Sequence, residues 1–305
     1  MKIAVTSPSF SKHPVLIKKI NEAFSDVKLN TEGKIFSQSE LIEFISGYDA
    51  TIVGLDEFNQ EVIDSSPDLK IISKYGVGLN NIDLDYCEKK GIAIGWTGGV
   101  NRLSVAEMCL GNILSLIRNM GPSSSQLSRG EWKKHGGEQL TGKRIGIIGL
   151  GFIGKEMVRL LAPFYCDIWV NDIEYDQDYI AKNNLSIKTK EEIYKACKVI
   201  SLHIPLVPET RELIGQNELA MMQNQTIILN SARGGMIDEI ALFNELKTGR
   251  LAAALDVFEI EPPTNSEFLK LDNLIATPHI GGSAVEAIEA MGMSAIEHLE
   301  KFRTK

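Results

Sequence analysis

The sequence contains few cysteines, and they are not arranged in pairs. Its four cysteines lie far apart along the chain and form no CxxC motif: Cys87, Cys109, Cys166 and Cys197. Closely spaced cysteines are typical of zinc sites and of disulfide-rich domains. The spacing therefore predicts neither, and we expect reduced, partly buried thiols. No cluster of histidine, aspartate and cysteine suggests a metal site elsewhere, so none is predicted.

Long apolar runs are also missing. The longer apolar stretches, such as residues 159–170, contain proline, aspartate or arginine, and none approaches the roughly 18 residues of a membrane span. Near the start of the chain only the apolar residues 3–5 precede the polar Thr6 and Ser7, which is too short for the core of a secretory signal. We therefore expect a cytoplasmic protein that does not interact with membranes.

Positive charge is in deficit, with 32 Lys and Arg against 40 Asp and Glu and a formal net charge of −8 at pH 7. This balance disfavours a dominant nucleic-acid-binding surface, although one local basic patch is compatible with it. The chain has 305 residues, 44% of them hydrophobic, which is enough for two domains with separate cores. We therefore expect a small-molecule partner and no nucleic acid.

Short β-branched runs alternate with helix-like segments in two separate series. The first series comprises residues 2–6, 51–53, 70–73 and 92–95. The second series comprises residues 143–149, 167–171, 199–203, 226–230, 252–257 and 274–277. Such alternation is typical of α/β folds with buried parallel strands, so two parallel sheets are predicted.

A turn-rich segment, residues 97–101, separates the two series and predicts a domain boundary. Ser104 follows this segment, with Glu107 three residues later, which matches a capping box and predicts that a helix begins at Ser104. After the second series, residues 284–305 form a long helical pattern with no strand left to follow. We expect this terminal helix to return to the first domain.

A glycine motif follows the first strand of the second series. Residues 143–148 run directly into Gly149-Leu-Gly-Phe-Ile-Gly154, and helix-forming residues come next. At a strand-to-helix junction, the first glycine permits a tight turn, the second lets the backbone approach a pyrophosphate, and the third allows close helix packing. The helix N-terminus adds unpaired amides and the positive end of its dipole. The motif predicts dinucleotide binding, and a P-loop is excluded because no Gly-Lys-Ser/Thr ending is present.

An acidic residue stands where the ribose of such a cofactor needs one. Asp172 ends the next predicted strand and follows Gly154 by 172 − 154 = 18 residues, close to the roughly 20 that are expected. A carboxylate there accepts hydrogen bonds from ribose hydroxyls and repels a 2′-phosphate. The sequence therefore predicts NAD as the cofactor.

Three polar segments follow predicted strands in the second half of the chain, at residues 230–235, 255–263 and 276–282. Ligands bind at the carboxyl ends of parallel strands. Together with residues 202–206 and the glycine motif, these segments resemble the D-isomer-specific 2-hydroxyacid dehydrogenases, closest in pattern to phosphoglycerate dehydrogenase-like members. Residues 75–83 and 103–107 also resemble family signatures, so the resemblance covers almost the whole chain.

The resemblance implies an α/β fold with two domains. A Rossmann NAD-binding domain, residues 99–280, is expected to be inserted in a flavodoxin-like substrate-binding domain, residues 1–98 and 281–305. The implied function is that of an NAD-dependent oxidoreductase that interconverts a D-2-hydroxy acid and its 2-oxo acid by hydride transfer, which needs no metal. Family members are typically homodimers, so a homodimer is expected.

By position, three residues match the catalytic residues of the family. Arg233 would hold the substrate carboxylate and polarise its C2 oxygen, because a bidentate guanidinium suits a planar anion. His279 would give a proton to the C2 oxygen as hydride arrives and would take it back in the reverse direction. Glu261 would orient this histidine and stabilise its charged form.

The resemblance also implies binding residues. Asp256 matches the residue that meets the nicotinamide carboxamide, and the backbone of Val77 and Gly78 would receive the substrate carboxylate. Glycines in that loop allow close approach to an anion, but they are equally compatible with a plain turn. The implied cofactor-binding residues are Gly149, Gly151, Phe152, Ile153, Gly154, Asp172, His203, Pro205, Ala232 and Asp256. The implied substrate-binding residues are Lys74, Gly76, Val77, Gly78 and Arg233.

Departures from the family pattern leave the substrate open. Lys74 stands where phosphoglycerate dehydrogenases usually carry arginine, Gly54 falls where another phosphate-directed arginine is expected, and Phe152 replaces the arginine of the glycine motif. Our hypothesis is that Lys74 reaches a distal phosphate and favours a 3-phosphoglycerate-type substrate. The alternatives are a hydroxypyruvate or glyoxylate reductase and, from a different class, an NAD-sensing corepressor-like binding protein. Arg102 either supplies charge to the cleft or faces solvent.

Overall fold

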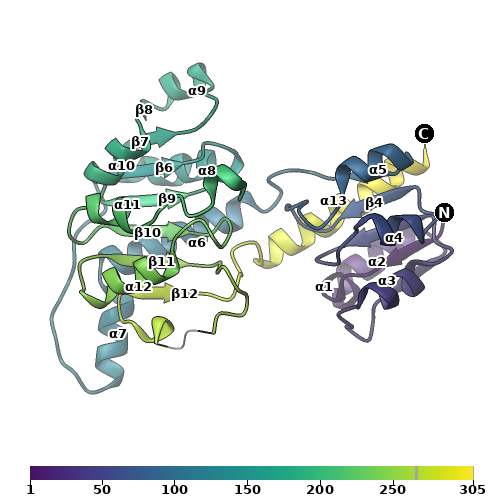
Figure 1. The fold of residues 1–305 in the computed structure, drawn as a ribbon, viewed down its shortest axis with the longest axis horizontal. Helices are drawn as coiled ribbons and strands as arrows, with labels where there is room; N and C mark the ends of the chain where they lie inside the picture. The colour runs from purple at the N-terminus through teal and green to yellow at the C-terminus, as the bar shows by residue number, and fades with distance from the viewer. Residues whose placement is uncertain (265–266, 305) are drawn as a thin grey trace. The chain divides into compact units, whose positions relative to one another are not determined.

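The computed structural model describes residues 1–264 and 267–304. The chain divides into two compact units, and the second is an insertion within the first (Figure 1). The first unit comprises Met1–Asn101 and Ser283–Lys305, and the second comprises Arg102–Gly282. The domain boundaries predicted from the sequence, after residues 98 and 280, lie a few residues before the observed ones, after residues 101 and 282.

A five-stranded parallel sheet forms the first unit, in the order β2-β1-β3-β4-β5. Its strands are β1 (Ile3–Val5), β2 (Val27–Leu29), β3 (Ala50–Val53), β4 (Ile71–Lys74) and β5 (Ala93–Gly95). Its helices are α1 (Pro8–Lys12), α2 (Pro14–Ala23), α3 (Gln38–Ile45), α4 (Gln60–Asp64), α5 (Leu84–Lys90) and α13 (Val285–Arg303). The strands β1, β3 and β4 are buried along their whole length. This burial explains the unbroken apolar and β-branched runs of β1 and β3, whereas β4 ends in the buried polar residues Ser73 and Lys74.

A seven-stranded parallel sheet forms the second unit, in the order β12-β11-β10-β9-β6-β7-β8. Its strands are β6 (Arg144–Ile148), β7 (Asp167–Asn171), β8 (Ser186–Ile187), β9 (Val199–Leu202), β10 (Ile227–Asn230), β11 (Ala252–Leu255) and β12 (Leu274–Ala276). Its helices are α6 (Arg102–Ile117), α7 (Met120–Ser128), α8 (Phe152–Leu161), α9 (Gln177–Lys182), α10 (Lys190–Ala196), α11 (Gln216–Met221) and α12 (Glu239–Lys247). Two parallel α/β sheets were predicted, and this fold class is confirmed.

Helices cover both faces of the second sheet. One core cluster joins residues of α6 and α8, such as Ile113 and Met157, to Ile145 and Ile147 of β6. A second cluster joins residues of α10, α11 and α12 to the opposite face of the sheet. The chain reverses direction along the sheet between β6 and β9, which is the topological switch point where open α/β sheets bind ligands.

Three local features differ from the sequence-based expectations. The edge strands β2 and β8 were missed, because each is two or three residues long and partly exposed and therefore lacks a buried apolar run. The helix expected to begin at Ser104 begins at Arg102. Ser104 therefore lies within the first turn of the helix and not at its N-cap, and its hydroxyl donates to the carbonyl oxygen of Gly281 at 2.6 Å. Within the described residues, no helix is long and apolar enough to cross a membrane.

The terminal helix α13 packs on α2 and β4 of the first unit, as expected for a returning helix. Gly292 is buried at its contact with α2. A Cβ atom at this position would lie 2.3 Å from Cδ1 of Leu16, which is far inside van der Waals contact. The close approach of the two helices therefore depends on glycine.

We expect Gly292→Ala to lower the stability of the protein by about 1–3 kcal/mol, the usual cost of overpacking a tight core contact. The matched control is Gly111→Ala in α6, where a Cβ would meet no atom within 4 Å. That control should be neutral or should raise stability by up to about 1 kcal/mol, because alanine is the better helix former. Urea unfolding midpoints test both variants, and equal midpoints would contradict the proposed packing constraint.

Candidate active site

The polar residues singled out in the second unit follow the carboxyl ends of its strands. Because all seven strands are parallel, these ends lie along one edge of the sheet. In strand order, the residues at this edge are the glycine motif after β6, Asp172 after β7, His203 after β9, Arg233 after β10, Asp256 and Glu261 after β11, and His279 after β12. The structure therefore brings the predicted cofactor and catalytic residues of this unit to a common edge.

The three motif glycines occupy three different environments. Gly149 has a φ of 101°, and a Cβ there would lie 2.4 Å from the carbonyl oxygen of His203. A Cβ at Gly154 would lie 2.0 Å from the carbonyl oxygen of Gly149. A Cβ at Gly151 would meet no atom within 4 Å, so this position borders open space. Gly149 and Gly154 thus permit close packing, whereas Gly151 leaves room for a ligand at the N-terminus of α8.

Asp172 holds the glycine loop against the end of β7. Its Oδ2 accepts a hydrogen bond from the Leu150 amide at 2.5 Å, and its Oδ1 accepts one from the Ile173 amide at 2.6 Å. Its own amide donates to the hydroxyl of Tyr175 at 2.9 Å. The neighbouring Ile173 side chain is almost fully exposed and carries no charge. The Asp172 carboxylate therefore lies beside the glycine loop, and Ile173 offers no positive charge that would attract a 2′-phosphate.

His203 follows β9 at the switch point. Its Nε2 is 2.8 Å from the hydroxyl of Ser201, while its Nδ1 is buried and has no partner among the described residues. Burial lowers the pKa of His203 to about 4, so the ring is neutral near pH 7. An unpartnered buried nitrogen beside the glycine loop fits a polar ligand there, and its environment is compatible with a bound dinucleotide. Pro205, two residues further on, is exposed.

Arg233 lies in a loop that close backbone packing holds in place. Its Nη1 donates to the carbonyl oxygen of Ala232 at 2.6 Å. The Asn230 side chain accepts from the Ala232 amide at 3.1 Å and donates to the Arg233 carbonyl oxygen at 2.8 Å. A Cβ at Gly234 would lie only 1.9 Å from the carbonyl oxygen of Phe258. The loop after β10 is thereby packed against the loop after β11, and the guanidinium keeps further donors for a ligand.

His279 and Glu261 form a close pair. Nδ1 of the imidazole is 2.8 Å from Oε2 of the carboxylate, and the side chains are 50% and 39% exposed. The other carboxylate oxygen, Oε1, accepts from the Phe258 amide at 3.1 Å. Glu261 is therefore held by the backbone while it orients the ring. This contact directs Nδ1 to the carboxylate and leaves Nε2 as the ring atom for proton exchange with a ligand.

The predicted substrate residues outside this edge belong to the first unit. Lys74, at the end of β4, is 5% exposed, and its ammonium donates to the Gly54 carbonyl oxygen at 2.5 Å and to Oδ1 of Asn81 at 2.7 Å. Gly76 has a φ of 138°, and the Val77 carbonyl oxygen accepts from the indole of Trp96 at 2.9 Å. Gly78 lies two residues further along this loop. A contact between Lys74 and a substrate phosphate would require the lysine to exchange these internal hydrogen bonds, so its placement favours a role in ordering the loops.

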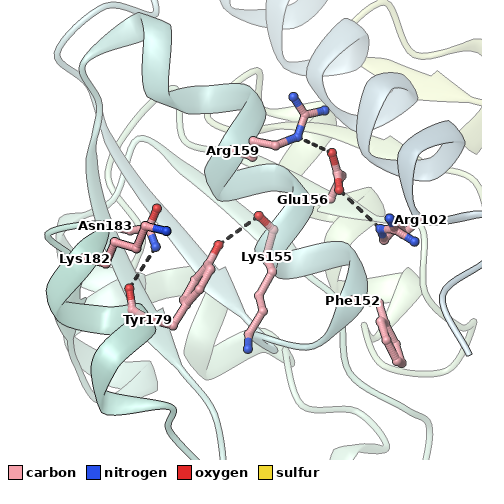
Figure 2. Close-up of a pocket in the computed structure, with 8 residues that line it drawn as sticks. All are labelled: Arg102, Phe152, Lys155, Glu156, Arg159, Tyr179, Lys182 and Asn183. Carbon is pink, nitrogen blue, oxygen red and sulfur yellow. Dashed lines mark hydrogen bonds and ion pairs between the residues drawn. The ribbon is translucent and has the colours of Figure 1, made fainter.

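Basic side chains gather on the flank of α8. A pocket of about 340 Å³ lies beside α8. Figure 2 shows the residues that line it: Arg102, Phe152, Lys155, Glu156, Arg159, Tyr179, Lys182 and Asn183. Glu156 lies between two cations, with its oxygens 3.4 Å from Nε of Arg102 and 2.5 Å from Nε of Arg159. Phe152 is 59% exposed. Arg102 therefore brings a positive charge beside the helix that begins at Phe152, a placement that the sequence alone left open.

Among the described residues, no group of three or more His, Cys, Asp or Glu side chains is arranged to hold a metal ion. The four cysteines are free thiols, and burial raises the pKa of Cys109 to about 11 and that of Cys197 to about 12. These thiols therefore stay protonated near pH 7 and are poor nucleophiles.

Comparisons with known proteins agree with this arrangement. A family model described as the NAD binding domain of D-isomer specific 2-hydroxyacid dehydrogenase matches residues 110–281. The chain is 39% identical to a D-3-phosphoglycerate dehydrogenase of Methanocaldococcus jannaschii over 99% of its own length, but it spans only 57% of that protein. It is 36% identical to a hydroxypyruvate reductase of Thermotoga maritima, over 90% of this chain and 91% of the relative. Among solved structures, NAD-bound 3-phosphoglycerate dehydrogenase of Entamoeba histolytica is similar with a TM-score of 0.82 and 29% identity, covering 100% of this chain and 96% of the other.

The buried, neutral state of His203 predicts a specific pH dependence of stability. An unperturbed histidine has a pKa near 6.5, and burial lowers that of His203 to about 4. Between these values the unfolded chain binds more protons than the folded one, so stability falls as the pH decreases, by up to about 1.4 kcal/mol per pH unit. Above about pH 6.5 both states are neutral at this residue, and it contributes no slope.

We expect His203→Gln to flatten the fall in stability between about pH 6.5 and 4, measured as urea unfolding midpoints across that range. His135→Gln is the matched control, because His135 is exposed. The same slope in His203→Gln and in the unaltered protein would rule out a buried neutral ring.

Proposed function

This chain belongs to the D-isomer specific 2-hydroxyacid dehydrogenase family, with its NAD-binding domain in the second unit, and on that premise we propose that it interconverts a small D-2-hydroxy acid and its 2-oxo acid. The observation that carries the proposal is the His279–Glu261 pair, which lies at the same sheet edge as the glycine motif. Bound NAD accepts or supplies the hydride in this chemistry. The residues of the chain bind and orient the substrate and move the proton.

His279 is the proposed acid and base. When a 2-oxo acid is reduced, Nε2 of His279 donates a proton to the C2 oxygen of the acid. In the oxidation, the same nitrogen removes that proton. Glu261, 2.8 Å from Nδ1, keeps the ring oriented and stabilises its protonated form through opposite charge. The backbone contact of Glu261 with Phe258 maintains this geometry.

Arg233 is the proposed ligand of the substrate carboxylate. One guanidinium nitrogen is held by the Ala232 carbonyl oxygen, which fixes the plane of the group while other N–H donors face outward to bind a planar anion. The same charge draws electron density from the neighbouring C2 oxygen as negative charge develops there. The backbone amides of Val77 and Gly78 are proposed as further donors to the carboxylate.

The proposed cofactor contacts follow from the environments described above. The amides at the N-terminus of α8, with Gly151, Phe152 and Ile153, bind the pyrophosphate. Asp172 accepts hydrogen bonds from the ribose hydroxyls. His203, Pro205 and Ala232 are proposed to contribute further cofactor contacts. The resemblance also implies a cofactor contact for Asp256, but both oxygens of its carboxylate accept hydrogen bonds from within the chain.

The proposed substrate is a small 2-oxo acid such as hydroxypyruvate or glyoxylate, or its phosphorylated counterpart 3-phosphohydroxypyruvate. The buried ammonium of Lys74 favours the unphosphorylated acids, because a distal phosphate needs an accessible cation.

A homodimer formed through the NAD-binding domain and a cytoplasmic location are also proposed. The segment around α7 in this domain exposes the large apolar side chains Met120, Leu127 and Trp132, which fits a contact with a second copy. The cysteines form no disulfides among themselves, which fits a reducing compartment.

The direct test is NADH oxidation with a panel of 2-oxo acids: 3-phosphohydroxypyruvate, hydroxypyruvate, glyoxylate and pyruvate, compared by kcat/KM. Turnover of at least one acid supports the dehydrogenase, and the rank order identifies the substrate. Absence of turnover together with cofactor-dependent binding of a peptide partner would favour the corepressor-like alternative.

We expect His279→Ala to lower kcat by about 100-fold or more, because general acid–base catalysis typically contributes 10²–10⁴-fold. The affinity for NADH should stay within a few-fold of that of the unaltered protein. His135→Ala, at an exposed position, serves as the control and should retain full activity. A near-normal kcat in His279→Ala would remove this residue from the mechanism.

NADH should be preferred over NADPH by about 100-fold or more in kcat/KM, because Asp172 accepts ribose hydrogen bonds and repels a 2′-phosphate. Asp172→Ala should narrow this ratio from both sides, with lower activity on NADH and higher activity on NADPH. Asp178→Ala removes a nearby exposed carboxylate and should leave the ratio unchanged. If Asp172→Ala kept the original ratio, Asp172 would not be the ribose ligand.

A further inference from the structure

The backbone at His279 has a conformation that is unfavourable for a residue with a side chain. Its φ is +52°, in the left-handed region, and its amide donates to the Thr277 carbonyl oxygen at 3.0 Å to close a tight turn. Non-glycine residues adopt this region at a cost and stay there only where surrounding contacts hold them. The turn formed by residues 277–281 therefore needs an anchor.

Asp256 provides contacts on both sides of this turn. Its carboxylate is 1% exposed, and its Oδ1 accepts from the Thr277 hydroxyl at 2.7 Å and from the Ile280 amide at 2.8 Å. Its Oδ2 accepts from the Gly281 amide at 2.7 Å. Hydrogen bonds to a buried carboxylate are among the stronger ones in proteins. One side chain thus holds the residues before and after His279.

The anchor is itself rigidly placed. Asp256 follows β11 directly, and its amide donates to the Asn230 carbonyl oxygen at the end of β10 at 3.0 Å. A Cβ at Gly281 would lie 2.9 Å from Oδ2 of Asp256 and 3.1 Å from Cε of Met108, so the turn is packed closely against both. The carboxylate of Asp256 therefore fixes the turn relative to the end of the sheet.

Two carboxylates on one short segment act on different parts of His279. Asp256 contacts the backbone that flanks the histidine, and Glu261, five residues later in the chain (261 − 256 = 5), contacts the imidazole. Neither carboxylate alone defines both the location and the orientation of the ring. Together they determine where Nε2 is presented.

We propose that Asp256 is a positioning residue that holds the 277–281 turn in its strained conformation and so places the imidazole of His279 for proton transfer. The proposal rests on the proposed function, in which His279 exchanges the substrate proton. It differs from the contact with the nicotinamide carboxamide that the family resemblance implies for Asp256, because the three donors bound here all come from the turn that carries the histidine.

The test uses two substitutions that loosen the turn to different degrees. Asp256→Asn keeps the shape of the side chain, but whichever way its amide is turned, an NH₂ group replaces an acceptor and faces a backbone N–H. Thr277→Val removes a single donor and leaves the carboxylate intact. We expect kcat to fall by about 10- to 100-fold in the first and by about 3- to 10-fold in the second, since a displacement of about 1 Å can cost 10²-fold in rate.

A double-mutant cycle with His279→Ala separates positioning from other roles. If Asp256 acts through the histidine, Asp256→Asn and Thr277→Val should cause little further loss of kcat in the His279→Ala background, and the affinity for NADH should change by less than a few-fold. The controls are Asp238→Asn, at the cap of α12, and Thr226→Val, a buried threonine, and both should retain kcat. Equal losses with and without His279, or a large loss of NADH affinity, would overturn the proposal in favour of a direct cofactor contact.

A readout that needs no turnover distinguishes failure of this proposal from failure of the proposed function. The His279 ring can be followed by NMR of the intact protein at one fixed pH, assigned by comparison with His279→Ala. Loosening the turn should weaken the contact with Glu261, and the ring signals should therefore shift and broaden in both variants, because the ring no longer keeps one orientation. Unchanged ring signals in Asp256→Asn and Thr277→Val would show that Asp256 does not position His279, whether or not the protein reduces a 2-oxo acid.

Discussion

The parallel arrangement of the strands in the second unit is the constraint on which the site depends. Since every strand of the sheet points the same way, the loops after β6, β9, β10, β11 and β12 emerge at one edge. Residues separated by more than a hundred positions, from Gly149 to His279, thereby come to the same edge of the sheet. The reversal of strand order between β6 and β9 opens the space above the glycine motif.

Close backbone packing then defines the shape of that edge. Gly149, Gly154 and Gly234 each bring a loop within a distance that excludes a Cβ, while Gly151 borders open space. These contacts pack the loop after β6 against the loop after β9, and the loop after β10 against the loop after β11, so that the polar side chains are carried on closely packed backbone. Carboxylates add to this packing. The side chains of Asp172, Asp256 and Glu261 accept hydrogen bonds from backbone amides and so hold the loops in place.

Charge at the site is distributed between buried and accessible groups. The ammonium of Lys74 and the ring of His203 are enclosed, the first held by oxygen acceptors and the second kept neutral by burial. Glu261 and His279 are partly exposed. Accessible groups can exchange protons with a ligand, whereas enclosed groups order the loops around it. Under the proposed function, the internal hydrogen bonds of Lys74 favour substrates that have no distal phosphate.

The α/β class, the central strands, the cofactor motif and the residue types of the candidate site could be predicted from the sequence, because each leaves a local pattern. Buried strands leave apolar runs, a dinucleotide loop leaves GxGxxG with an acid about 20 residues on, and strand-end polar segments stand out from their surroundings. The edge strands β2 and β8 were missed because short, partly exposed strands leave no such pattern, and the helix α6 begins two residues before the predicted start at Ser104. Three features could be found only in the folded chain: the Lys74 ammonium binds internal acceptors, Arg102 lies beside α8, and Asp256 accepts hydrogen bonds from the turn that carries His279. Each of these features depends on contacts between segments that are far apart in the sequence. No local sequence pattern indicates which groups will form those contacts.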